Sequence, residues 1–374
     1  MYKKSFVPVN VPLINGNEKK YLNECISSGW ISSEGPFVKQ FEEQFAIRVK
    51  RKHAIAVSSG TAALDVAVEA LGIGPGDEVI LPSFTIISCI SQIVRSGAQP
   101  VLVDSDPITW NMDSNQIAGK ITKRTKAIMI VHIFGLPVDM ESILNVAKKH
   151  NIKIIEDAAE MHGQTYKNKP CGSFGDISTF SFYPNKHITT GEGGMIVTND
   201  EALANNCRSL RNLCFQPQER FVHKRLGWNY RMTNVQAAIG LAQLERLDEF
   251  IKRKRQMGAK YTKMLSGLID AQLPITKTDY ANNIYWVFGL VLKDSIEFDA
   301  KEAIKRLNEK GIDCRPFFYP MHQQPILLDM GFFQSESHPI AERLSKRGLY
   351  VPSGMALTNE QINIVSKKVI EVLG

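Results

Sequence analysis

Short apolar runs alternate with stretches of helical periodicity between residues 54 and 211. The apolar runs predict strands at 54–57, 78–81, 100–103, 127–131, 153–156 and 195–198. The periodic stretches predict helices at 62–71, 84–95, 140–150 and 201–211. Strands that alternate with helices in this way are typical of a mainly parallel sheet with helices on both faces. We therefore expect an α/β fold whose ligands bind beyond the carboxyl ends of the strands.

The segments on either side of this region complete a two-domain arrangement. Two helices are expected before it, and a loop at 213–227 and one long helix at 235–264 after it. Polar turns near 270–283 then precede a second alternation, with strands at 285–292 and 313–317 around a helix at 300–310. A terminal helix opens with a capping box, Thr358 and Gln361. We expect a large domain over 1–250, which includes the N-terminal segment, and a smaller α/β domain over 251–374.

Composition fits an ordinary globular protein. Of the 374 residues 44% are hydrophobic and 22% are charged, and the net charge is +7. The basic residues are spread along the chain, and the densest run, 252–255, is interpreted as the solvated face of a helix. This balance favours a phosphorylated small molecule over nucleic acid as a partner. No apolar run is long enough for a membrane span and no signal-peptide core is present, so a soluble, cytoplasmic protein is expected.

Cysteines and histidines give no sign of a metal or disulfide framework. The six cysteines form no Cys-x-x-Cys pair, and the eight histidines lack metal-ligand spacing. Free buried or half-buried thiols in a reducing compartment are the expectation, with no metal site.

Two residues carry the candidate chemistry. Asp157 ends the apolar strand at 153–156, and Lys186 lies on a loop just before the glycine-rich run 191–194. An enzyme that uses pyridoxal phosphate needs an amine to form a Schiff base and a carboxylate to hold the pyridine nitrogen protonated. Asp157 could instead cap a helix, and most lysines are surface residues. The apolar surroundings of Lys186, which favour a more nucleophilic amine, support the catalytic interpretation.

Other candidates have equally simple structural explanations. The turn at 58–61 joins a strand to a helix, so Ser59, Gly60 and Thr61 form either a phosphate site or an ordinary helix cap. Glu160 is either beside the phenolic oxygen of the cofactor or a solvated glutamate. Phe84 could stack on a cofactor ring, although a core position is commoner.

Several motifs together resemble the nucleotide-sugar aminotransferases of the DegT family, which are fold-type-I pyridoxal phosphate enzymes. The motifs are SSGTAAL (58–64), GDEVILP (76–82), EDAAE (156–160), SFYPNK (181–186) and TGEGG (190–194). They occur in the family's order and cover nearly the whole chain. The resemblance implies a large domain with a seven-stranded type of sheet, a smaller C-terminal lobe, and cycling between pyridoxal and pyridoxamine phosphate.

The resemblance also assigns roles to single residues. Lys186 matches the Schiff-base lysine, Asp157 the partner of the pyridine nitrogen, and Glu160 the position beside the ring oxygen. The phosphate cradle corresponds to Ser59, Gly60, Thr61 and Ser181, and the stacking aromatic to Phe84. Asn229 matches a residue that a neighbouring subunit offers to the phosphate, which implies a homodimer with shared active sites. The candidates for the sugar-nucleotide side are Trp30, Arg231, Tyr319 and His322.

The runs 229–234, 237–245 and 315–322 resemble the family members that aminate C4 of GDP-4-keto-6-deoxy-D-mannose with L-glutamate. That activity serves O-antigen or related lipopolysaccharide synthesis. Pro184 and His187 depart from the usual pattern around the lysine, so another UDP- or dTDP-keto-sugar is an alternative. A sugar 3-dehydratase, in which histidine replaces the lysine, is disfavoured because Lys186 is retained. The Asp157–Lys186 pair argues against a non-catalytic regulatory protein. A nucleotide-binding oxidoreductase would need a Gly-x-Gly-x-x-Gly turn after the first strand, and the turn at 58–61 does not supply it.

Overall fold

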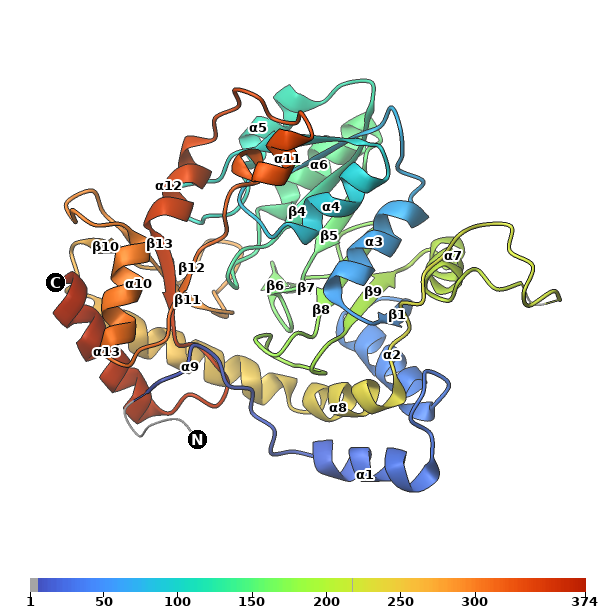
Figure 1. The fold of residues 1–374 in the computed structure, drawn as a ribbon, viewed down its shortest axis with the longest axis horizontal. Coiled ribbons are helices and arrows are strands. Elements are labelled where there is room, and N and C mark those ends of the chain that lie inside the picture. Colours follow the sequence, from blue (N-terminus) through green and yellow to red (C-terminus); the bar gives the residue numbers. More distant parts are fainter. Residues whose placement is uncertain (1–5, 217) are drawn as a thin grey trace.

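The centre of the molecule is a seven-stranded sheet in the computed structural model, which describes residues 6–216 and 218–374 (Figure 1). Its strands, in spatial order, are β1 (His53–Val57), β9 (Gly194–Thr198), β8 (Ile177–Ser181), β5 (Lys153–Asp157), β4 (Thr125–Val131), β2 (Glu78–Pro82) and β3 (Gln99–Val103). β9 runs antiparallel to both of its neighbours, and the other pairings are parallel. The predicted mainly parallel α/β fold is confirmed.

The strands are apolar because both faces of the sheet are covered. In β4, Ile128 and Ile130 pack into one core, whereas Ala127 and Met129 pack into the core on the opposite face. The first core includes residues of α2 (Pro36–Arg48), α5 (Ser114–Lys120), α6 (Met140–His150) and α8 (Asn234–Leu244). The second includes residues of α3 (Gly60–Ala70), α4 (Ser88–Arg95) and α7 (Glu201–Arg211). This two-sided burial leaves the ends of the strands as the open edge.

Several predicted elements differ in detail from the structure. The helix expected at 84–95 begins only at Ser88, so residues 84–87 form an irregular segment beside the sheet. The long helix expected at 235–264 is two helices, α8 and α9 (Leu247–Leu265). Arg246 between them has non-helical dihedral angles, φ −109° and ψ 9°. Strand β8, which leads into the Lys186 loop, was not predicted.

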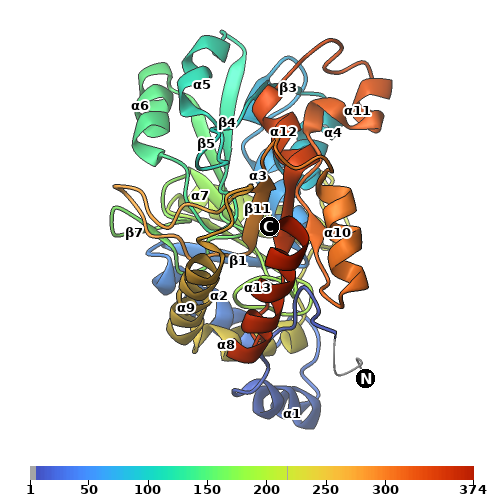
Figure 2. The same cartoon turned by 90° about the vertical axis from the view of Figure 1, so that its left-hand side faces the viewer.

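A second, four-stranded sheet is built from the C-terminal part of the chain. Its order is β10 (Ala271–Gln272), β11 (Phe288–Leu292), β13 (Gly348–Val351) and β12 (Arg315–Pro316). The helices α10 (Ala300–Glu309), α12 (Pro339–Arg347) and α13 (Asn359–Leu373) pack around it, and Figure 2 shows α13 beside α9. The capping box of Thr358 and Gln361 is present as predicted. The domain boundary at 250 stays a prediction, and α9 runs through it.

Residues 7–11 of the N-terminal segment reach this second sheet region, whereas α2 packs against the large sheet. Val7 forms a bridge with Ile312, and its amide donates to the carbonyl of Gly311 at 2.8 Å.

The elements not yet named are α1 (Glu18–Ser28), β6 (Thr165–Tyr166), β7 (Lys169–Pro170), η1 (Met321–Gln323) and α11 (Pro325–Asp329). No helix among the described residues is both long and apolar enough to cross a membrane.

The basic run at 252–255 is only in part the solvated face that its composition indicated, because Lys252 and Arg255 are exposed but Lys254 is not. Lys254 is only 1% exposed, and its ammonium donates to the backbone carbonyls of Trp286, at 2.8 Å, and Ser353. Arg253 donates to the carbonyl of Met355 at 2.7 Å. These side chains join α9 to the C-terminal sheet. All six cysteines are buried and free, as expected.

Candidate active site

A cavity of about 380 Å³ lies at the carboxyl ends of the strands of the large sheet. Residues that follow β1, β2, β4, β5 and β8 contribute to its wall, as the parallel topology predicts. The C-terminal lobe closes it with Trp286, Phe318 and Tyr350. The cavity brings together Asp157, Glu160 and Lys186.

Asp157 is the last residue of β5 and is 4% exposed. One carboxylate oxygen accepts a hydrogen bond from the amide of Ala159 at 3.0 Å, and the other accepts one from the thiol of Cys89 at 3.3 Å. Burial raises the pKa of Asp157, while these bonds and the charge of Lys186 oppose the rise. A cationic ring nitrogen opposite this carboxylate would favour its ionised form.

Lys186 lies on the turn after β8, where its amide donates to the carbonyl of Tyr183 at 2.9 Å. The side chain borders the cavity and is partly buried. Burial lowers the pKa of this amine below the ordinary value, and the nearby carboxyl groups of Glu160 and Asp157 oppose that effect. A lowered pKa increases the neutral, nucleophilic fraction of the amine.

Glu160 is a buried cavity residue, 6% exposed, rather than a solvated glutamate. Its carboxyl group accepts a hydrogen bond from the amide of Phe134 at 2.6 Å. Burial raises its pKa to about 8, although the charge of Lys186 acts in the opposite direction. Near neutral pH this carboxyl group can therefore hold a proton and donate it to an oxygen acceptor.

The turn between β1 and α3 faces the cavity opposite the end of β8. Ser59 is the N-cap of α3 and accepts from the amide of Ala62 at 3.0 Å, so the capping interpretation is correct as well. Gly60, Thr61 and Ser181 also line the cavity. A Cβ atom on Gly60 would lie 2.7 Å from the Cβ of Ser181, so only glycine permits this approach. The turn combines a helix N-terminus with hydroxyl groups, which suits a phosphate.

These groups fit pyridoxal phosphate. A buried carboxylate, a nucleophilic lysine and a phosphate cradle share one cavity, and the hydroxyl of Thr179 on its wall is buried without a hydrogen-bond partner among the described residues. Gly60 closes the cradle, where any side chain in its place would collide with Ser181. Asp157 would hold the ring nitrogen, Lys186 the aldehyde carbon, and residues 59–61 with Ser181 the phosphate.

Phe84 is placed differently from the expectation. It is fully buried, and its ring packs against Phe134, Phe317 and Phe318 at centroid distances of 5.7–6.0 Å. Phe84 does not line the cavity. The chain after β2 is irregular until Ser88, and the two residues that follow Phe84 line the cavity instead. These are Thr85 and Ile86.

Several cavity residues that come from distant segments were not predicted from the sequence. The most distant are Trp286, Phe318 and Tyr350, and the nearer ones include Thr85, Ser88, His132 and Glu192. Trp286 stands out because its ring centroid is 3.9 Å from the ammonium of Lys186. No sequence signal marks it, since it precedes an ordinary apolar strand. Asn185, whose carbonyl accepts from the indole of Trp286 at 2.8 Å, and Glu192 lay within recognised motifs but were not predicted as site residues.

The five residues predicted for the partner subunit and the sugar nucleotide lie outside this cavity. Trp30 is 52% and Tyr319 50% exposed. Arg231 donates to the side chains of Asn229, at 2.9 Å, and Asn212, at 3.0 Å. His322 is buried, and its ring bonds to Ser83 at 2.7 Å and Glu342 at 3.0 Å. Their substrate and partner roles stay predictions.

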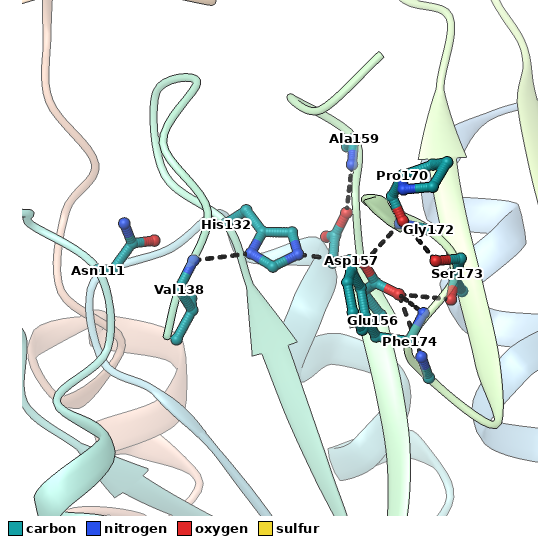
Figure 3. A network of polar contacts seen from close by, with 12 residues as sticks. Asn111, His132, Val138, Glu156, Asp157, Ala159, Pro170, Gly172, Ser173 and Phe174 are labelled. Atoms are coloured by element: carbon teal, nitrogen blue, oxygen red, sulfur yellow. Dashed lines mark hydrogen bonds and ion pairs between the residues drawn. The ribbon is translucent and has the colours of Figure 1, made fainter. Parts of the chain in front are cut away.

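A buried network lies directly behind Asp157 (Figure 3). The carboxylate of Glu156 accepts hydrogen bonds from three amides of a following loop, those of Gly172, Phe174 and Gly175. It also accepts from the hydroxyl of Ser178 in β8 and from the ring of His132. The other ring nitrogen of His132 accepts from the amide of Val138 at 3.1 Å. Cys171 lies close enough to form a metal-ligand set with Glu156 and His132. However, the carboxylate of Glu156 and both ring nitrogens of His132 already form hydrogen bonds with protein groups.

Comparison with known proteins gives one consistent family. The family model of the DegT/DnrJ/EryC1/StrS aminotransferases matches residues 12–370. The chain is 44% identical to a GDP-perosamine synthase of Escherichia coli O157:H7, over 98% of each chain. It is 40% identical to one of Vibrio cholerae, over 95% of this chain and 96% of that one. Among solved structures, the aminotransferase TlmJ of Streptoalloteichus hindustanus has a TM-score of 0.90 at 30% identity, with 98% of each chain covered.

Proposed function

The chain belongs to the DegT/DnrJ/EryC1/StrS aminotransferase family and is a pyridoxal phosphate-dependent sugar aminotransferase, and on this premise we propose that it aminates GDP-4-keto-6-deoxy-D-mannose. L-Glutamate is the proposed amino donor, C4 of the sugar the acceptor carbon, and GDP-perosamine the product. The observation that carries this proposal is 40–44% identity, over at least 95% of the chain, to three enzymes named GDP-perosamine synthase. The Asp157–Lys186 cavity supports it.

The cofactor, when bound, supplies an aldehyde carbon for amines and a ring that accepts the electron pair left by a departing proton. Asp157 holds the ring nitrogen in its protonated form, because a buried carboxylate stabilises an adjacent positive charge. The hydrogen bonds from Ala159 and Cys89 orient this carboxylate at the end of a rigid strand. Glu160, with its pKa of about 8, can donate to the ring oxygen.

Lys186 has two tasks in this proposal. Its Nζ would hold the aldehyde carbon of the cofactor, and when free the same amine can accept and donate protons. In the first half-reaction Nζ accepts the proton from the α-carbon of glutamate. In the second half-reaction Nζ donates a proton to C4 of the sugar. Burial lowers its pKa, which keeps part of the amine neutral for the first step.

A homodimer with shared active sites is part of the proposal. The segment after α7 projects from the body of the molecule (Figure 1). It exposes apolar side chains, with Phe221 80% and Leu226 91% exposed. Exposed apolar side chains grouped on a projecting loop suit contact with a second copy of the chain. Asn229, at the end of this segment, would then reach the partner's phosphate cradle. The proposed setting is the cytoplasm, with the product used for O-antigen synthesis.

Product analysis tests the proposal. The purified enzyme is incubated with pyridoxal phosphate, L-glutamate and GDP-4-keto-6-deoxy-D-mannose, and the nucleotide sugars are identified by mass spectrometry and NMR. The expected product carries an amino group at C4. UDP- and dTDP-linked keto-sugars serve as competing substrates in parallel reactions. Amination of one of these, with none of the GDP-sugar, would contradict the proposed substrate while leaving the aminotransferase chemistry in place.

A further inference from the structure

The ammonium of Lys186 rests on the face of an indole ring. Its Nζ is 3.9 Å from the ring centroid of Trp286. The amine makes no hydrogen bond or ion pair with any residue in the described part of the chain, although Asp157 and Glu160 border the same cavity. A cation over the face of a tryptophan is attracted by the ring quadrupole. The face of the indole ring therefore holds the ammonium without exchanging a proton with it.

Trp286 is fixed on several sides and is 4% exposed. Its indole N–H donates to the carbonyl of Asn185 at 2.8 Å, so the ring is tied to the residue just before Lys186. Its backbone amide donates to the carbonyl of Phe134 at 3.1 Å. Trp286 belongs to the C-terminal lobe and Asn185 to the Lys186 loop. These two bonds therefore hold the ring at a defined place between the lobes.

Lys254 fixes the remaining backbone group of Trp286. This lysine is 1% exposed, and its ammonium donates to the carbonyl of Trp286 at 2.8 Å and to the carbonyl of Ser353. No carboxylate pairs with it among the described residues. Burying an ammonium without a carboxylate is unfavourable, so the two carbonyls must compensate for the lost water. Lys254 thereby ties α9 to the segment just before β11, at the position that carries the indole.

We propose that Trp286 is a positioning residue that holds Lys186 while the lysine is not bonded to the cofactor, and that Lys254 keeps the indole in place. The inference rests on the proposed function, in which Lys186 leaves the cofactor once per half-reaction. A lysine paired with Asp157 or Glu160 would exchange its proton with a carboxylate. Against the indole it has no acid–base partner and stays near the reacting carbon.

The consequence is a measurable effect on the acidity of Lys186. A cation–π contact stabilises the ammonium, so its loss should lower the pKa of Lys186 by about half a unit to one and a half units. The pKa is obtained from the rate at which cofactor-free protein recombines with pyridoxal phosphate between pH 6 and 9.5, since only the neutral amine reacts. The cofactor's own ionisations are common to all variants and cancel in the comparison.

The variants are Trp286→Leu, Trp286→Phe and Lys254→Met. Recombination below the pKa should be about 3- to 30-fold faster for Trp286→Leu than for the parent protein. Trp286→Phe should give an intermediate pKa, because phenylalanine is a weaker cation acceptor and cannot reach Asn185. Lys254→Met should lower the pKa in the same direction. The matched control is Trp110→Leu: Trp110 is 3% exposed and packs on Phe134, but is not part of the cavity wall.

An unchanged Lys186 pKa in folded Trp286→Leu would overturn the inference, as would a change of equal size in Trp110→Leu. If Trp286→Leu does not fold, judged by circular dichroism, Trp286→Phe decides, and an unchanged pKa in that variant has the same meaning. Failure of the proposed function is distinguishable. If only the proposed sugar is wrong, the parent protein forms the lysine-linked cofactor band but does not aminate that sugar. If the role of Lys186 is wrong, the parent protein forms no such band.

Discussion

Replacing Glu156 by glutamine tests how the strand that carries Asp157 is held. The carboxylate of Glu156 is fully buried and accepts five hydrogen bonds, in the network that Figure 3 shows. Their lengths run from 2.5 Å, from the amide of Gly172, to 3.2 Å, from the ring of His132. Glutamine has the same shape, but an NH2 group that can only donate replaces one of the two carboxylate oxygens. Whichever oxygen it replaces, that NH2 group faces at least two N–H donors.

The pKa of Glu156 gives the expected magnitude. Burial alone would raise it, but the bonds from His132, Gly172 and Phe174 outweigh burial and lower it from 4.5 to about 2. That difference, at about 1.36 kcal/mol per unit, corresponds to about 3 kcal/mol of folding stability. Because the folded-state pKa lies below the unfolded value, this stability is present above pH 4.5. It is lost as the pH falls toward 2.

The assay is urea unfolding under reducing conditions, followed by circular dichroism. At pH 7 Glu156→Gln should unfold with a free energy about 3 kcal/mol below that of the parent protein. At pH 4 the gap should shrink by about 1 kcal/mol, because the parent carboxylate has begun to lose its advantage. The control is Glu141→Gln, which removes an exposed ion pair with Lys167 and should leave stability unchanged. A gap below about 0.5 kcal/mol at pH 7, with no pH dependence, would refute the account of this network.

Three further substitutions test the site itself. Asp157→Asn should slow the glutamate half-reaction by about two orders of magnitude or more in stopped-flow absorbance, because a neutral amide cannot stabilise the charged ring, and a change below threefold would contradict this role. Gly60→Ala should raise the dissociation constant of pyridoxal phosphate about tenfold or more, since the new Cβ would lie 2.7 Å from the Cβ of Ser181. The control is Gly267→Ala, where a Cβ meets nothing within 4 Å. His322→Ala should lower the unfolding free energy by about 1–3 kcal/mol and leave the KM for the nucleotide sugar unchanged; the opposite pattern would favour the substrate role predicted from sequence.

The parts of the site predictable from sequence are those that local pattern places at strand ends. Asp157 ends an apolar run, and Ser59 to Thr61 break another before a helix, so parallel topology alone brings them to one edge. Lys186 follows in the same motif-rich region. Most of the large sheet was predictable because its buried strands are continuous apolar runs. The exception is β8, whose sequence ISTFS is more than half polar.

The remaining parts depend on contacts between segments far apart in the chain. Trp286 is 101 residues from Asn185, whose carbonyl it contacts, and the strand that follows it looks like any other apolar strand. Lys254 lies in a basic run that normally indicates a surface, and it is buried because carbonyls 32 and 99 residues away accept its protons. Phe84 was predicted as a cofactor contact because it follows a strand. Its ring instead packs among aromatic residues that include Phe317 and Phe318 of the C-terminal lobe, a contact that no local pattern indicates.

The central claim is tested most directly by a two-step absorbance experiment on enzyme loaded with pyridoxal phosphate. L-Glutamate is added, the amino acid is removed, and GDP-4-keto-6-deoxy-D-mannose is then supplied, with Lys186→Ala as the control. We predict that glutamate removes the visible band of the lysine-bound cofactor and that the sugar restores it, while the control never forms that band. A band that glutamate removes but this sugar does not restore would contradict the proposed substrate. A parent protein that never forms the band would contradict the role of Lys186.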